Sequence, residues 1–416
     1  MLNRRVLLCW SLLTLSSTAL AGPAEDLATF LKTTRSDDTS IPVASWTRRP
    51  LTKSEADQAT QALLTHFTAA RRASLDPEWQ AKAIKAADQT LKFEYRTFGD
   101  KPANGRSLWI SMHGGGSTTA KINDQQWQNQ VRLYEPSEGI YLAPRAPTDT
   151  WNMWHQSHMD ALLDRLIEAA IVCADVDPNR VYLMGYSAGG DGVYQLAPRM
   201  ADRFAAAAMM AGHPNDAKPD GLRNLSFTIH MGANDSAFNR NDVARQWGEM
   251  LGSLHKTDQG GYFHLTKLHE GKGHWMDRQD AEALAWMAAH TRRTTPDRIV
   301  WAQSSTTHKR FYWVGTEQPA AGSRLDLRLN GNTITVDLST SITQFTLLVN
   351  DQCIDLDQPI RISGLSLADL DIYATRSIHD IWTSLNERFD PAYLPSARVK
   401  VKLEKDNAPA VPPATK

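Results

Sequence analysis

The sequence predicts an α/β fold with a mostly parallel central sheet. Strand and helix patterns alternate over residues 91–295, and several of the strand patterns are apolar at every position. Such strands are typical of a parallel sheet that helices cover on both faces. A glycine-containing turn that leads from a strand into a helix lies within this region and favours the same fold class.

The spacing of apolar residues gives the expected elements of this region. We expect strands at 91–98, 107–112, 140–143, 181–184, 205–210, 225–231 and 262–268. We expect helices at 160–173, beyond residue 189, at 242–251 and at 280–290.

The segments on either side have different patterns. Residues 22–90 are predicted to be helical, including the stretch 79–84, and they suggest packing rather than chemistry. Residues 296–405 are predicted to form a mainly β module. Its expected elements are a hairpin of 324–329 and 333–336 around Asn330-Gly331-Asn332, strands at 344–349 and 397–403, and a helix at 378–388. The tail 406–416 is rich in alanine and proline and is predicted to be disordered.

Length and charge limit the possible functions. A chain of 416 residues exceeds one average domain. The net charge is −1 and no basic block stands out, which argues against nucleic acid as the main partner. The sequence leaves the oligomeric state open.

The N-terminus has the pattern of an export signal. Arg4-Arg5 precede an apolar stretch at 6–15, and Ala19-Leu20-Ala21 form a cleavage site before Gly22. The apolar stretch is too short for a stable membrane span. We therefore expect residues 1–21 to be a signal peptide and the mature protein to be periplasmic or extracellular, by a general secretory or twin-arginine route.

Two cysteines remain in the expected mature chain, Cys173 and Cys353. They are far apart in sequence, and an oxidising compartment permits a bridge between them. We expect two unpaired buried thiols instead.

A candidate nucleophile lies in Gly185-Tyr186-Ser187-Ala188-Gly189. A sharp strand-to-helix turn needs small residues two before and two after its centre, because the two backbones nearly touch there. Gly185 and Gly189 meet that need, so Ser187 is predicted to stand exposed as a nucleophile. The alternative is a glycine-rich turn with a solvated serine.

A serine nucleophile requires a base and a group that orients the base. Asp235 follows the expected strand 225–231 and is the candidate acid, although a turn or helix-cap role is the alternative. His274 lies in the loop before the last expected helix and is the candidate base. His269, which ends a strand, is the reserve, and His264 is expected to pack within that strand.

A third element follows the strand 107–112, in His113-Gly114-Gly115-Gly116. A tetrahedral acyl intermediate needs preorganised N–H donors for its oxyanion. The amide of Gly114 or Gly115, together with that of Ala188, is predicted to supply them. The alternative is a flexible glycine loop.

Four further residues are weaker candidates for the wall of a substrate pocket: Trp151, Trp154, His213 and Trp275. The spacing of His155, His158 and Asp160 matches no zinc pattern, and no dinucleotide or phosphate-loop fingerprint occurs. We therefore expect neither a metal site nor a cofactor.

Four motifs together resemble the α/β-hydrolase superfamily. They are His-Gly-Gly-Gly at 113–116, Gly-Tyr-Ser-Ala-Gly at 185–189, Gly-Ala-Asn-Asp at 232–235 and Gly-His-Trp at 273–275. Within it, residues 91–292 look like secreted polyhydroxybutyrate depolymerases and feruloyl esterases, which border the prolyl oligopeptidase and dienelactone hydrolase groups. The resemblance implies Ser187 as nucleophile, His274 as base and Asp235 as acid, but it does not fix the substrate.

The sequence thus favours an exported serine hydrolase that acts on a small-molecule or polymeric carboxylic ester. One alternative is a serine peptidase of the prolyl oligopeptidase type. Another is a non-catalytic protein whose β module binds a polymer or carbohydrate through Trp301, Tyr312 and Trp313. We expect these aromatic residues to seal the module to the core instead.

Overall fold

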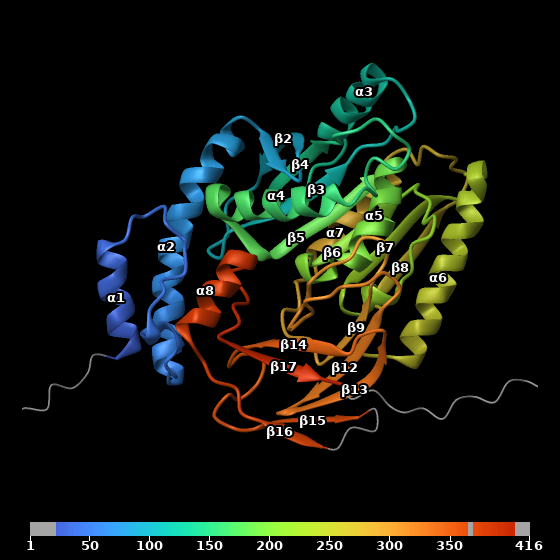
Figure 1. The fold of residues 1–416 in the computed structure, drawn as a ribbon. Coiled ribbons are helices and arrows are strands. Elements are labelled where there is room, and N and C mark those ends of the chain that lie inside the picture. The colour runs from blue at the N-terminus through green and yellow to red at the C-terminus, as the bar shows by residue number, and fades with distance from the viewer. Residues whose placement is uncertain (1–21, 365–368, 404–416) are drawn as a thin grey trace, which may run out of the picture.

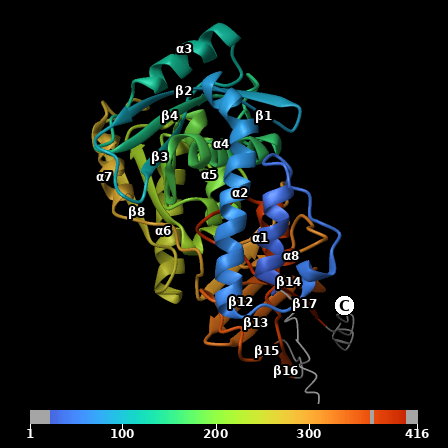
Figure 2. The same cartoon turned by 90° about the vertical axis from the view of Figure 1, so that its left-hand side faces the viewer.

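The computed structural model describes residues 22–364 and 369–403 (Figures 1 and 2). The predicted signal peptide at 1–21 and the predicted disordered tail at 406–416 lie outside the described residues, so both stay predictions.

An eight-stranded sheet forms the centre of the fold, in the order β1-β2-β4-β3-β5-β6-β7-β8. Its strands are β1 (Ala83–Ala86), β2 (Gln89–Phe98), β3 (Arg106–Met112), β4 (Gly139–Arg145), β5 (Val176–Tyr186), β6 (Ala206–Met210), β7 (Ser226–Gly232) and β8 (His264–His269). The strands from β4 to β8 in this order are parallel, whereas β1 and β2 add antiparallel pairings at one edge. The expected mostly parallel sheet is confirmed.

Helices cover both faces of this sheet. They are α3 (Ala120–Val131), α4 (His158–Ala174), α5 (Ala188–Arg199), α6 (Arg240–Thr257) and α7 (Glu282–Ala288). Ser111 of β3 accepts a hydrogen bond from Gln130 of α3, whereas the next residue, Met112, lies against Gly192 of α5. Successive strand residues point to opposite faces, so α3 and α5 lie on opposite sides of the sheet.

The helices of the N-terminal segment end at residue 80. It contains α1 (Pro23–Thr33) and α2 (Lys53–Gln80), and Thr52 caps α2 by accepting from the amide of Glu55. The prediction of helix through residue 84 is wrong, because β1 begins at Ala83 and pairs with β2. Lys82 has φ 50°, which turns the chain into the sheet, and Ile84 is fully buried there. The pairing of β1 with β2 at the edge of the sheet therefore outweighs the helical spacing of the apolar residues in 79–84.

The C-terminal module contains two small sheets. One has the order β10-β11-β14-β17 and the other β16-β15-β13-β12-β9. The strands are β9 (Arg298–Ala302), β10 (Arg310–Phe311), β11 (Val314–Gly315), β12 (Arg324–Asn330), β13 (Thr333–Thr340), β14 (Gln344–Val349), β15 (Ile360–Gly364), β16 (Leu370–Ile372) and β17 (Ala397–Lys402). Asn330 pairs with Thr333, which confirms the predicted hairpin, and α8 (Ile378–Glu387) is the predicted helix.

The module packs against the rest of the chain through buried groups. Trp301, Tyr312 and Trp313 are at most 3% exposed, so the expected packing role of these aromatic residues holds. Helix α8 contacts α2, and the module and α3 lie at opposite ends of the molecule (Figures 1 and 2).

Cys173 and Cys353 are free and only partly buried, and burial raises the pKa of each thiol to about 12.

A buried ion pair joins the two parts. Both terminal nitrogens of Arg292, which follows α7, donate to the carboxylate of Asp390 in the module, each at 2.7 Å. Burial alone would raise the pKa of Asp390, but the neighbouring Arg292 outweighs it and holds that pKa well below its usual range. A bidentate ion pair of this kind fixes the relative orientation of the two side chains as well as the distance between them.

Asp390→Asn is expected to lower the free energy of unfolding by about 3–5 kcal/mol, because it leaves Arg292 as a buried cation without its partner. Since the folded pKa is depressed, this contribution is present above the unfolded pKa of about 3.9 and is lost as the pH falls through the folded value. Urea unfolding at neutral pH measures the loss. The exposed pair Arg361–Asp369 supplies the control: Asp369→Asn is expected to change stability by less than about 1 kcal/mol. Equal effects of the two variants would contradict this account.

Candidate active site

Ser187 lies at the tip of a strained turn between β5 and α5. Its φ is 56° and its ψ is −121°, a backbone conformation that residues other than glycine rarely adopt. A Cβ at Gly185 would stand 2.2 Å from the carbonyl oxygen of Gly189, and one at Gly189 would stand 2.1 Å from that of Met112. The two glycines therefore permit a backbone approach that no side chain would allow.

The structure brings Ser187, His274 and Asp235 together in one hydrogen-bonded chain. Nε2 of His274 lies 3.0 Å from Oγ of Ser187, and its Nδ1 lies 2.7 Å from Oδ2 of Asp235. A carboxylate only accepts, so Nδ1 carries the proton and Nε2 is free to accept from the serine hydroxyl. This is the geometry in which an imidazole can deprotonate a serine.

The acid and histidine loops are bonded to each other. The amide of Ala233 donates to the carbonyl of His269 at 3.0 Å, and the amide of Asn234 donates to that of Lys272 at 2.8 Å. Asp235 itself is 3% exposed. The two loops that follow β7 and β8 therefore hold the carboxylate and the imidazole at a fixed separation.

Tyr186 positions the histidine loop from below, and the sequence analysis did not single it out. Its hydroxyl donates to the carbonyl of His274 at 2.6 Å and accepts from the amide of Met276 at 3.1 Å. The available signal was its place immediately before the candidate nucleophile, where the hydroxyl of a buried tyrosine needs hydrogen-bond partners.

The glycine loop 114–116 runs beside Ser187. A Cβ at Gly114 would stand 3.1 Å from Cβ of Ser187, and Gly115 and Gly116 have φ of 112° and 81°. The amide of Gly116 donates to Oδ1 of Asn123 at 2.9 Å. Gly114 of this loop and Ala188 of α5, two of the residues whose amides are predicted to hold an oxyanion, therefore lie next to the serine on two chain segments.

His113 holds this loop in shape. Its Nε2 accepts from the amide of Ala146 at 3.1 Å, so its Nδ1 carries the proton and donates to the carbonyl of Gly114 at 2.6 Å. Burial lowers the pKa of His113 to about 4, which keeps the ring neutral. Trp154 is fully buried and donates from Nε1 to the carbonyl of His113 at 2.9 Å. The prediction of Trp154 as a pocket wall is therefore wrong, because the residue supports the loop from inside.

A cavity of about 570 Å³ opens onto Ser187 and His274. Its wall also includes Gly114, Gly115, Gly116, Thr118, Ile122, Gln126, Asn129, Gln130, Leu133, Tyr186 and Trp275. Helix α3 thus supplies three carboxamides, and Trp275, one of the candidate pocket residues, lies on this wall and is 50% exposed. Among the described residues that line this cavity there is no lysine, arginine, aspartate or glutamate.

Two other pocket candidates lie outside that wall. Trp151 is 57% exposed, with its Cα 3.3 Å from where a Cβ of Gly116 would be, so it stands beside the glycine loop. The amide of His213 donates to Asp191 at 2.6 Å, which ties it to α5. Neither residue is among those that line the cavity.

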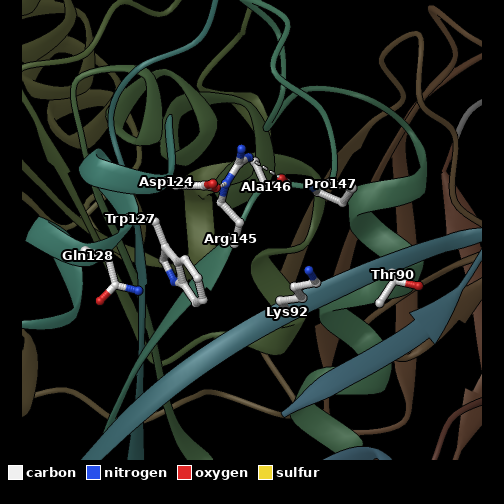
Figure 3. Close-up of a pocket in the computed structure, with 8 residues that line it drawn as sticks. All are labelled: Thr90, Lys92, Asp124, Trp127, Gln128, Arg145, Ala146 and Pro147. Carbon is white, nitrogen blue, oxygen red and sulfur yellow. Dashed lines mark hydrogen bonds and ion pairs between the residues drawn. The ribbon is translucent and has the colours of Figure 1, made fainter. Parts of the chain in front are cut away.

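A second cavity, of about 410 Å³, lies between β2, the end of β4 and α3 (Figure 3). Arg145 on its wall bonds Asp124 and also donates to Asp149 at 2.6 Å. Asp149 in turn accepts from Nδ2 of Asn123 at 2.8 Å. Although partial burial opposes it, these hydrogen bonds lower the pKa of Asp149. The series of hydrogen bonds from Arg145 through Asp149 to Asn123 therefore supports the glycine loop.

Of the residues weighed as metal ligands in the sequence, Asp160 is engaged with other partners. Asp160 is buried and pairs with Arg199 at 2.8 Å and with His308 at 2.7 Å. A different group places its ligand atoms within 4.8 Å of one another: His230, His269 and Glu282. They come from three separate elements, β7, β8 and α7, so no sequence spacing could reveal them.

Comparisons with known proteins agree with this fold. Residues 133–275 match the dienelactone hydrolase family. The putative esterase NocK of Nocardia uniformis subsp. tsuyamanensis is 27% identical over 169 residues, which are 36% of this chain and 47% of that protein. The chain therefore spans about half the length of this relative.

Solved structures with a similar arrangement include a thermostable esterase, with 17% identity, a TM-score of 0.38 and coverage of 50% of this chain and 62% of the other. The poly(3-hydroxybutyrate) depolymerase LpqC of Bordetella parapertussis has 16% identity, a TM-score of 0.36 and coverage of 50% and 87%.

Among residues 22–364 and 369–403, no helix has the length and apolar character of a membrane span. The sheet order is that of the expected α/β-hydrolase fold, and residues 133–275 within it match the dienelactone hydrolase family.

Proposed function

We propose that the protein is a serine hydrolase that cleaves carboxylic esters without a net charge near the bond that breaks. The observation that carries this proposal is the unbroken chain of hydrogen bonds from Ser187 through His274 to Asp235. The match to the putative esterase NocK and the family match favour the same class of reaction.

The reaction follows from these contacts. Oγ of Ser187 attacks the carbonyl carbon while Nε2 of His274 takes the hydroxyl proton, and Asp235 stabilises the imidazolium. The oxygen of the tetrahedral intermediate gains negative charge and is held by the amide of Ala188 and one from the glycine loop; such a donor is typically worth about 10²–10³ in rate. His274 then passes its proton to the departing alcohol. Water, deprotonated by the same nitrogen, releases the acid from Ser187.

The cavity wall favours a neutral substrate. A charged group that enters the cavity would lose hydration and would find no charged side chain among the described lining residues to replace it. The carboxamides of α3 can hydrogen-bond to ester or hydroxyl oxygens, and Trp275 offers an apolar surface on the same cavity wall as Ser187. A volume of about 570 Å³ admits a small-molecule ester or one end of a polymeric one.

The two alternative functions have less support. A serine peptidase of the prolyl oligopeptidase type that binds a substrate amine needs an acidic group for it, and the described cavity wall offers none. A carbohydrate-binding role for the β module depended on exposed aromatic residues. Trp301, Tyr312 and Trp313 are buried, so they are not free to stack on a ligand.

Replacement of the proposed nucleophile tests the mechanism directly. Ser187→Ala is expected to lower kcat for a para-nitrophenyl ester by about 10⁴-fold or more and to abolish labelling by a fluorophosphonate. Ser236→Ala is the matched control, because Ser236 is an exposed serine beside Asp235 and its loss should change neither readout. Labelling that persists in Ser187→Ala would show that another residue is the nucleophile.

A matched pair of esters tests the substrate class. Para-nitrophenyl butyrate and the mono-para-nitrophenyl ester of succinic acid have acyl groups of similar length, but only the second carries a carboxylate. We expect kcat/KM for the butyrate to be at least about tenfold higher, which corresponds to about 1.4 kcal/mol in the transition state. Alanine para-nitroanilide should not be cleaved. Faster turnover of the anilide than of either ester would favour the peptidase alternative.

We also propose that the protein is exported by the signal peptide at 1–21, on the basis of its charged start, short apolar stretch and Ala19-Leu20-Ala21. Expression of the full chain in a bacterium, followed by fractionation and intact-mass measurement, should give a periplasmic or secreted form that begins at Gly22. Replacement of Ala19 and Ala21 by bulky residues should block this cleavage. A mature cytoplasmic chain that still begins at Met1 would contradict export.

A further inference from the structure

Two buried histidines and one glutamate meet beneath the loops of the candidate active site. His230 lies on β7, His269 ends β8 and Glu282 begins α7. His230 is fully buried and His269 is 3% exposed, whereas the side chain of Glu282 is 39% exposed. The three groups do not line the cavity at Ser187.

The distances between their ligand atoms suit a tetrahedral ion. Nδ1 of His230 lies 3.2 Å from Nε2 of His269 and 3.7 Å from Oε1 of Glu282, and the last two atoms are 4.0 Å apart. Zinc bonds to nitrogen and carboxylate oxygen are about 2.0–2.2 Å, so ligand atoms at neighbouring corners of a tetrahedron are about 3.3–3.6 Å apart. The observed distances bracket this range. Small movements of the half-exposed Glu282 would complete the fit.

The surroundings of His230 orient its ring toward this point. The hydroxyl of Thr228 donates to the carbonyl of Leu265 at 3.2 Å, so its oxygen accepts from Nε2 of His230 at 2.9 Å. Nε2 then carries the proton, and the lone pair of Nδ1 faces His269 and Glu282. Histidines that bind metals typically donate their second ring nitrogen to a fixed acceptor in this manner.

The carboxylate is oriented in the same way. Oε2 of Glu282 pairs with the ammonium of Lys267, which leaves Oε1 directed at the two imidazoles. Lys267 adds a positive charge nearby, but it does not occupy the ligand oxygen. Exposure of Glu282 also provides a path from solvent and room for a water as fourth ligand.

We propose that His230, His269 and Glu282 form a binding site for a divalent transition metal of the zinc class. Two imidazoles and one carboxylate are a ligand set that suits such ions better than magnesium or calcium. The site departs from the absence of metal expected from sequence spacing. It is separate from the proposed esterase reaction and does not depend on it.

A metal at this position would join β7 and β8, the strands that lead to Asp235 and His274, to helix α7. The carbonyl of His269 accepts from the amide of Ala233, two residues before Asp235, and His269 is five residues before His274. Fixing the ends of β7 and β8 to α7 would therefore stabilise both loops. The role we infer is structural, because the ligands lie away from the cavity wall.

Zinc titration of the untagged full-length protein by calorimetry, after dialysis against a chelator, tests the site. We expect one saturable equivalent and a rise in Tm as zinc is added. Thr228→Val, which removes the acceptor of Nε2 together with the hydrogen bond to the carbonyl of Leu265, should weaken zinc binding about 10–100-fold. Glu282→Gln should weaken it at least as much while the fold, read by circular dichroism, is retained. Glu270→Gln removes the same charge from the exposed neighbour of His269 and should bind zinc like the parent protein.

Three results would overturn the proposal. The first is no saturable zinc binding, which would leave a metal-free hydrogen bond between His230 and His269. The second is unchanged affinity in Glu282→Gln. The third is loss of binding in His274→Ala with retention in Glu282→Gln, which would place the ion at the proposed active site. None of these readouts uses esterase activity, so failure of the metal site and failure of the proposed function are distinguishable.

Discussion

The close approach of three backbone segments around Ser187 is the constraint on which the rest of the site depends. Gly189 lies so near the carbonyl of Met112 that a single methyl group would collide with it, and Gly185 faces Gly189 in the same way. This contact forces the serine into a left-handed conformation and places it beside the glycine loop. Backbone strain of this kind persists only where several surrounding contacts hold the residue in its unfavourable conformation.

Several independent contacts supply that support. His113 and Asn123 fix the glycine loop from two sides, and Trp154 fills the space beneath it. Tyr186 links the turn to the histidine loop through its hydroxyl. The turn that exposes Ser187 therefore also helps to position the imidazole of His274. Polar residues that merely lay near one another on the surface would not link the serine turn, the glycine loop and the histidine loop in this way.

The sequence predicted those features that depend on local signals. Apolar runs located most of the strands, and Gly185, Gly189 and the ends of two strands indicated where Ser187, Asp235 and His274 would lie. Features that depend on tertiary pairing were missed. Strand β1 replaces a helical pattern because β2 offers it an edge, and α3 is too polar for apolar spacing to reveal. Trp154 looked like a pocket wall, because sequence does not distinguish an aromatic side chain above a loop from one beneath it.

The most direct test of the central claim is a crystal structure of the protein after reaction with a phosphonate ester. The account predicts a covalent bond from phosphorus to Oγ of Ser187, with the free phosphonyl oxygen about 2.7–3.1 Å from the amides of Ala188 and of Gly114 or Gly115. His274 should still lie between Ser187 and Asp235. An adduct on another residue, or a phosphonyl oxygen that points to solvent away from both amides, would contradict it.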